Sequence, residues 1–155
     1  SSLEAARHKL WRSLCDRVIA QDDELAALHS LTADEQTYYA ARRFANEVAN
    51  GGFEQYFLNS AADLYHDSII ALKRLGALGA VALLEQASFL AFDGEAPPAD
   101  SDKRGCRFNP EDHDDADELC EKLDAFDEAF FDMLDSLDER ITQFAIERGL
   151  LTTCA

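Results

Sequence analysis

The sequence predicts an all-α protein: a single compact domain of several helices that ends in a long acidic amphipathic helix or helix pair. Two observations support this class. Apolar residues recur at intervals of three and four through most of the chain, which is the spacing of one helix face. No segment alternates apolar and polar residues in the manner of a half-buried strand. We therefore expect five to seven helices within residues 1–155 and no sheet.

The composition fits one folded domain with an acidic surface. The chain has 155 residues, of which 47% are apolar and ten are phenylalanine, enough to bury a substantial core. Its 31 acidic residues against 14 basic ones give a net charge of −17. Such a surface repels nucleic acid and anionic membranes and attracts basic partners over long distances. The simpler alternative is a charge that serves solubility alone.

The sequence suggests no cofactor, no metal and no catalytic site. Cys15, Cys106, Cys120 and Cys154 form no Cys-x-x-Cys pair and no zinc-like spacing with the four histidines, so we expect free thiols in a reducing cytoplasm. No run of about 20 apolar residues is present, and no signal segment opens the chain, which favours a cytoplasmic protein. Because no nucleophile setting, calcium loop or phosphate-binding glycine loop is present, we do not expect an enzyme.

The first helices have recognisable limits. Residues 3–20 predict an amphipathic helix, and residues 22–31 predict a short helix or turn. The segment Thr32-Ala33-Asp34-Glu35 fits a capping box, in which a hydroxyl and a carboxylate satisfy free backbone N–H groups at a helix start. The helix that begins there should extend to Asn50.

Residues 46–63 form the joint around which the other helices should pack. Asn50-Gly51-Gly52 ends one helix, because asparagine and glycine tolerate the left-handed backbone conformation of many helix ends. Aromatic residues that should be buried then follow at helical spacing, namely Phe53, Tyr56 and Phe57. Asn59 or Ser60 can cap the next helix by accepting a hydrogen bond from a free backbone N–H group.

Three further segments follow the joint. The first is a helix that should end at Gly76. Residues 77–92 are apolar on almost every side, as is usual for a central helix. Residues 93–112 contain three prolines and two glycines among small and charged residues, which predicts one long surface loop.

The joint also carries a family resemblance. Asn50-Gly51-Gly52-Phe53-x-Gln55-Tyr56-Phe57-x-Asn59-Ser60, followed by Asp63, resembles the signature of the DUF4375 domain family. The resemblance is dense over residues 46–92. The characterised member of that family is an all-helical, dimeric bacterial DNA mimic that antagonises a DNA-binding transcription factor, so the resemblance implies these properties here. Within the signature, Gln55 and Asn59 are interpreted as capping or buried structural residues, with contact to a ligand as the alternative.

Residues 111–139 carry most of the negative charge, with fourteen acidic residues against one lysine and a local net charge of −13. Apolar residues at helical spacing form one narrow stripe: Leu119, Leu123, Phe126, Phe130, Leu134, Leu137, Ile141 and Phe144. Acidic residues with the same spacing form what we call the acidic ridge on the opposite side: Asp114, Asp117, Glu121, Asp124, Glu128, Asp132, Asp135 and Glu139. Arg148 and Gly149 should end the helix.

The spacing of the acidic ridge can be compared with that of DNA. Its carboxylates recur about every 5 to 6 Å along the helix axis, whereas one DNA strand carries a phosphate about every 3.4 Å. Two ridges side by side would reach a comparable density, so the DNA-mimic hypothesis favours a homodimer or a neighbouring acidic helix. Phe131 lies between the apolar stripe and the ridge, and it marks either a helix break or a dimer contact.

We therefore expect an acidic DNA-mimic-like protein. Its ridge would bind the basic surface of a DNA-binding protein of the transcription-factor type and block DNA binding, without direct contact to nucleic acid or membrane. Two alternatives stay open. The chain could be an immunity or inhibitor protein that neutralises another basic protein. It could also be a soluble helical domain with no electrostatic partner, in which the ridge is only a solvated helix face.

Overall fold

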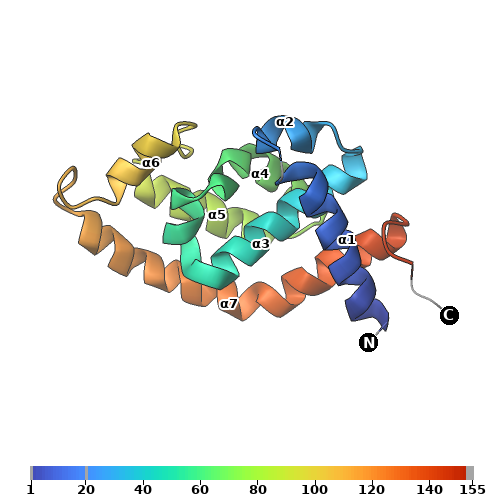
Figure 1. Cartoon of the computed structure of the whole chain (residues 1–155). Helices are drawn as coiled ribbons and strands as arrows, with labels where there is room; N and C mark the ends of the chain where they lie inside the picture. The colour runs from blue at the N-terminus through green and yellow to red at the C-terminus, as the bar shows by residue number, and fades with distance from the viewer. Residues whose placement is uncertain (1, 20, 153–155) are drawn as a thin grey trace.

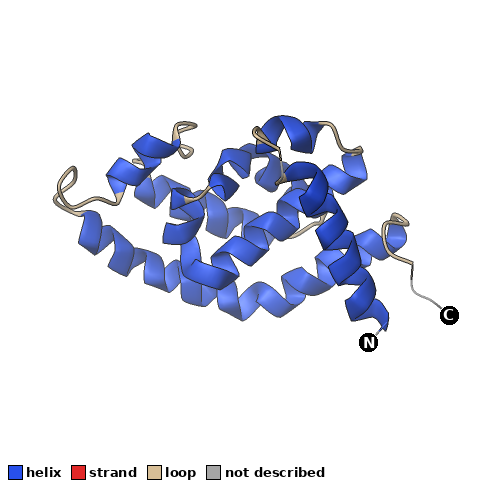
Figure 2. Ribbon diagram, viewed as in Figure 1, coloured by secondary structure: helices blue, strands red, loops and turns tan. Residues whose placement is uncertain are grey.

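Seven α-helices and one short 3-10 helix make up the protein in a computed structural model that describes residues 2–19 and 21–152. In chain order they are α1 (Ser2–Val18), α2 (Glu24–His29), α3 (Ala33–Leu58), the 3-10 helix η1 (Ser60–Leu64), α4 (Tyr65–Arg74), α5 (Leu78–Ala91), α6 (Ser101–Arg107) and α7 (Ala116–Glu147). The described residues contain no strand (Figure 2). The predicted all-α class is confirmed.

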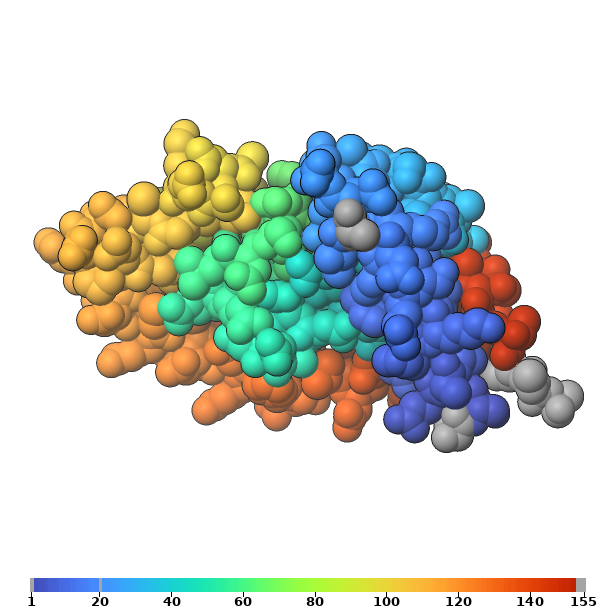
Figure 3. Space-filling view, viewed as in Figure 1, coloured from blue at the N-terminus to red at the C-terminus, as the bar shows by residue number. Residues whose placement is uncertain are grey.

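The two long helices, α3 and α7, organise the molecule. Helix α3 packs most extensively against α7 and α4, and α5 packs against α7 and α4. Helix α7 runs along one side and forms the lower edge in Figures 1 and 3. The central helix is therefore α3. The apolar helix α5 packs against α4 and α7 and leaves Leu78 and Phe89 exposed, so its all-round hydrophobicity does not reflect a central position.

The helix ends follow the local signals in the sequence. The Thr32 hydroxyl accepts a hydrogen bond from the Glu35 N–H at 3.2 Å, and the Glu35 carboxylate accepts one from the Thr32 N–H at 3.0 Å. This is the predicted capping box. Gly76 and Gly149 follow α4 and α7 with φ angles of 70° and 73°, as the prediction of glycine at both helix ends requires.

Helix α3 contains the predicted joint as a kink at Gly52, where φ is 78° and ψ is −174°. A Cβ atom at this position would clash with the carboxylate of Asp127 on α7. Because glycine has no Cβ, Asp127 comes close enough to accept a hydrogen bond from the Phe53 N–H at 2.9 Å. A side chain of α7 thus satisfies a donor that the kink in α3 leaves free.

The aromatic residues after the kink form the centre of the core. Phe53, Tyr56 and Phe57 are fully buried, as predicted. The ring of Phe53 meets Phe126 and Phe130 of α7 edge to face, with ring centroids 6.4 and 6.3 Å apart. Such ring pairs stabilise the fold beyond the burial of apolar area alone. The aromatic residues that follow the kink therefore hold α3 and α7 together.

The surface loop predicted over residues 93–112 is wrong in its middle, because residues 101–107 form α6. Arg104 of this helix is fully buried. Its Nε donates to the carbonyl of Phe57 at 2.8 Å, and its Nη2 donates to the carboxylate of Asp63 at 2.8 Å. The sequence did not predict this burial, because a charged residue in a segment rich in proline, glycine and other charged residues usually lies on the surface. Arg104 also donates to the nearby carbonyls of Pro98 and Ala99, but Phe57 and Asp63 lie more than 40 residues earlier in the chain, where no local pattern reveals them.

Cys15, Cys106 and Cys120 are free thiols, as predicted, whereas Cys154 lies outside the described residues. Burial raises the pKa of Cys15 and of Cys120 to about 11, which keeps both thiols protonated at neutral pH. None of the described helices has the combination of length and hydropathy that crossing a membrane requires.

Candidate functional site

The acidic ridge predicted from the sequence is a continuous exposed surface. All eight of its residues are exposed, and seven of them lie on α7. The exception is Asp114, which lies in the turn before α7. The helix begins at Ala116, and the residue before it, Asp115, pairs with Arg107 at 2.9 Å. The prediction that Asp114 lies within the helix is therefore wrong.

The apolar stripe fixes the direction in which the ridge faces. Most stripe residues are buried, and Phe126 and Leu134 are partly buried against the core. Helix α7 is continuous over its whole length, so the predicted alternative of two collinear helices does not apply, and Phe131 marks no break. A continuous amphipathic helix with one buried face must direct its opposite face to solvent. The ridge therefore follows the solvent-facing side of α7, and α7 lies along the lower edge of the molecule (Figure 3).

No ridge carboxylate makes an ion pair or side-chain hydrogen bond within the described residues. Other acidic residues of the same segment do have partners. Glu118 pairs with Lys122 at 3.2 Å, and Asp138 pairs with Arg42. Lys122 and Arg42 thus contact acids beside the ridge, and Arg140 of α7 donates to the carbonyl of Leu75 at 3.3 Å, so the ridge carboxylates keep no ion pair among the described residues.

Asp127 lies at the border between the ridge and the core. Burial raises its pKa, and the nearby carboxylates of Asp124 and Glu54 raise it further, whereas the hydrogen bond from the Phe53 N–H opposes the shift. Glu54 belongs to α3 and extends the negative region beyond α7. The sequence pattern did not include Glu54, because nothing local indicates that the kinked end of α3 lies beside α7.

The signature residues of the joint form a separate, internal polar network. The buried carboxylate of Glu47 accepts hydrogen bonds from Asn59, from Gln55 at 3.3 Å and from Arg43 at 2.7 Å. Arg43 also contacts Glu24 of α2 at 3.3 Å. Gln55 and Asn59 therefore have a structural role as donors to Glu47, but the first interpretation holds only in part, because Gln55 is half-buried and Asn59 is exposed.

The predicted side-chain cap by Asn59 or Ser60 is absent from the described structure. Asn59 is the residue before η1, but its side chain makes no capping hydrogen bond. The physical reason is that its amide donates to Glu47 instead. The Ser60 hydroxyl likewise contacts Arg43 and Glu24 rather than the backbone of η1.

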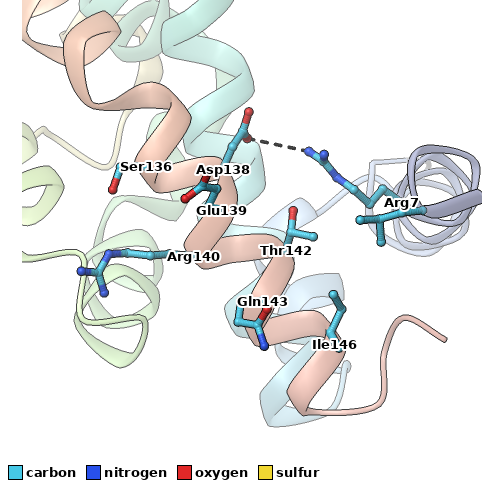
Figure 4. Close-up of a pocket in the computed structure, with 9 residues that line it drawn as sticks. Arg7, Ser136, Asp138, Glu139, Arg140, Thr142, Gln143 and Ile146 are labelled. Atoms are coloured by element: carbon cyan, nitrogen blue, oxygen red, sulfur yellow. Dashed lines mark ion pairs between the residues drawn. The ribbon is translucent and has the colours of Figure 1, made fainter. Parts of the chain in front are cut away.

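A groove of about 610 Å³ separates α1 from the C-terminal half of α7 (Figure 4). Asp138 points from α7 toward Arg7 of α1, and the two side chains are 3.9 Å apart. Ridge residue Glu139 also lines this groove. Within the described part of the chain, no three histidine, cysteine or acidic residues are grouped in a way that could hold a metal ion.

Fold and surface together define an all-α acidic protein that presents a row of unpaired carboxylates along one long helix. A family model described as DMP19-like protein matches residues 29–148, and the chain belongs to the DMP19-like protein family. DMP19 is a DNA-mimic protein, which agrees with the DNA-mimic family expected from the signature at residues 46–63. The match covers the joint, α6 and the entire acidic ridge. Searches of curated proteins and of solved structures give no match.

Proposed function

We propose that this protein is a DNA mimic whose acidic ridge occupies the DNA-binding surface of a basic protein of the transcription-factor type. One observation carries the proposal: all eight ridge carboxylates are exposed, and none has a partner among the described residues. Cations of another molecule can pair with them without first breaking an internal ion pair. Membership of the DMP19-like family supports the same function.

The ridge acts as a collective surface. Each exposed carboxylate contributes only about 0.2 to 1 kcal/mol to binding, because solvent and salt screen surface ion pairs. Together the carboxylates attract a basic partner from a distance and raise its association rate. Competition with DNA should therefore weaken steeply as the salt concentration rises, as does DNA binding itself.

A homodimer is the second part of the proposal. A single ridge has carboxylates about every 5 to 6 Å, whereas a DNA strand has phosphates about every 3.4 Å, so two ridges side by side imitate DNA better than one. Chains that each carry a net charge of −17 repel each other, and their interface must be weakly charged. The exposed face of α5, with Leu78 and Phe89, satisfies this condition. Sedimentation at micromolar concentration should give twice 17.2 kDa, and a 17.2 kDa species would remove the dimer.

The experiment that tests the proposed function is a competition assay. A basic helix-turn-helix repressor is bound to a labelled DNA duplex, and the protein is added across a salt series. The triple variant Glu121→Gln, Asp124→Asn, Glu128→Gln should release less DNA than the wild type, with the largest difference at low salt.

The matched control neutralises three exposed acidic residues away from the ridge, through Asp16→Asn, Asp22→Asn and Glu95→Gln. Both variants carry the same net charge. If net charge alone governs competition, they will lose equal activity. Undiminished competition by the folded ridge variant would contradict the proposal and would mean that the ridge is only a solvated helix face.

A further inference from the structure

Phe131 is a large apolar residue that helix α7 leaves in solvent. Its exposed fraction is 52%, whereas its neighbour Phe130 is fully buried. The ring rests against that of Phe130, with centroids 6.0 Å apart and planes inclined by 71°. Because α7 is continuous here, no helix break explains the position of Phe131. One side of the ring contacts Phe130 of the core, and the other side is exposed to solvent.

The exposed ring lies beside two ridge carboxylates. Glu128 is three residues before Phe131, and Asp135 is four residues after it. Residues at these separations are neighbours on a helix surface, with Cβ atoms about 5 to 6 Å apart. Both carboxylates are exposed and unpaired within the described residues. A partner cation that binds either carboxylate from the side of Phe131 can therefore also contact the ring.

An aromatic ring beside carboxylates distinguishes arginine from lysine. A guanidinium group is planar and weakly hydrated, so it can stack on a ring while its N–H groups donate to a carboxylate. The lysine ammonium group is compact and strongly hydrated, and it gains less from the ring. DNA phosphates provide no such ring. Phe131 thus adds to the ridge a form of recognition that DNA mimicry alone does not require.

We propose that Phe131 is a specificity-determining residue of the acidic ridge and selects partners that present arginine from a basic helix. The guanidinium group would lie over the exposed face of Phe131 and donate to Glu128 or Asp135. The inference rests on the proposed function, because it takes the ridge as the binding surface. It goes further by naming the side chain that the partner supplies.

Two synthetic amphipathic helical peptides of equal length and charge provide the probe, one with arginine and the other with lysine at every basic position. Their dissociation constants are measured for the wild type and three variants. The wild type should bind the arginine peptide about three- to tenfold more tightly than the lysine peptide. Phe131→Ala should lose most of this preference, because only the bidentate contact of arginine with a carboxylate still distinguishes the two peptides. Phe131→Leu, which keeps an apolar side chain without a ring, should behave in the same way.

Ile70→Ala is the matched control, since Ile70 is 59% exposed but lies on α4, away from the ridge and from the proposed dimer face. It should keep the preference of the wild type. The ridge variant Glu121→Gln, Asp124→Asn, Glu128→Gln should weaken both peptides, and it serves to test the proposed function. If both peptides bind through the ridge but Phe131→Ala keeps the arginine preference, only the role of Phe131 is overturned.

Two other outcomes also decide the matter. If neither peptide responds to the ridge variant, the proposed function fails together with the inference. If Phe131→Ala shifts the sedimentation coefficient from dimer to monomer while the arginine preference persists, Phe131 is a contact between two copies of this chain. The role in partner selection is then wrong.

Discussion

The joint at residues 46–63 and the acidic ridge on α7 use polar side chains in opposite ways. At the joint, Glu47 accepts hydrogen bonds from three side chains, and the guanidinium group of Arg104 donates to backbone carbonyls and to Asp63. On the ridge, no carboxylate has a partner among the described residues. Polar groups that are satisfied internally stabilise the fold, whereas charges left unpaired in solvent are available to another molecule.

The two regions meet at Asp127, which belongs to the helix of the ridge and accepts a hydrogen bond from the joint. Its raised pKa reflects both environments, because burial by the joint and repulsion from ridge residue Asp124 act in the same direction. Substitutions in the joint, at this border and on the ridge should therefore have progressively smaller effects on stability.

The largest expected effect concerns Arg104. Replacing it with alanine removes the guanidinium donor of Asp63 and of the Phe57 carbonyl, and should lower the free energy of unfolding by about 3 to 5 kcal/mol. Urea denaturation measures the change. Lys103→Ala, one residue earlier and exposed, should change stability by less than about 0.5 kcal/mol. Equal midpoints for the two variants would show that the stability of the joint does not depend on the buried Arg104 of α6.

Asp127→Asn tests the border. An acidic group whose pKa is raised in the folded state destabilises the fold as pH rises through that pKa, so the charged form of Asp127 lowers stability at neutral pH. Asparagine keeps an oxygen that can accept from the Phe53 N–H. The variant should therefore be at least as stable as the wild type at pH 7, with the difference vanishing below the ordinary aspartate pKa of about 3.9.

Thermal unfolding across pH measures this effect, and Asp127→Ala is its control. Alanine removes the acceptor of the Phe53 N–H, so Asp127→Ala should lower the free energy of unfolding by about 1 to 3 kcal/mol at every pH. A pH-independent difference between Asp127→Asn and the wild type would mean that the charge of Asp127 has no effect on folding.

The smallest effect is expected on the ridge itself. Glu121→Gln, Asp124→Asn and Glu128→Gln remove no internal ion pair, and they relieve like-charge repulsion worth about 0.2 to 0.5 kcal/mol for each helical pair. The thermal midpoint should stay the same or rise slightly, and the rise should disappear in high salt. A clear loss of stability would show that the ridge carboxylates stabilise the fold. The ridge and the joint would then differ less in their contribution to stability.

Local patterns in the sequence predicted much of this architecture because the interactions behind them are local. The capping box at Thr32 joins residues three apart, and the kink at Gly52 depends on the conformational freedom of glycine. The stripe and the ridge of α7 repeat at the helical period over many turns. The DNA-mimic family was also expected, from a motif within a single stretch of chain. A structural role for Gln55 and Asn59 was also among these expectations, and both side chains donate to Glu47.

Tertiary structure decided what depends on distant partners. Helix α6 escaped prediction because its buried Arg104 finds acceptors at Phe57 and Asp63, far earlier in the chain. In the same way, only the packing of α3 on α7 determined that Asp127 would satisfy the backbone at Gly52. The sequence by itself determined which helix faces are apolar and which are acidic, because residues three and four apart in the chain lie on the same face of a helix. Packing decided which of those charges are neutralised, because an ion pair requires proximity in space, which residue order alone does not specify.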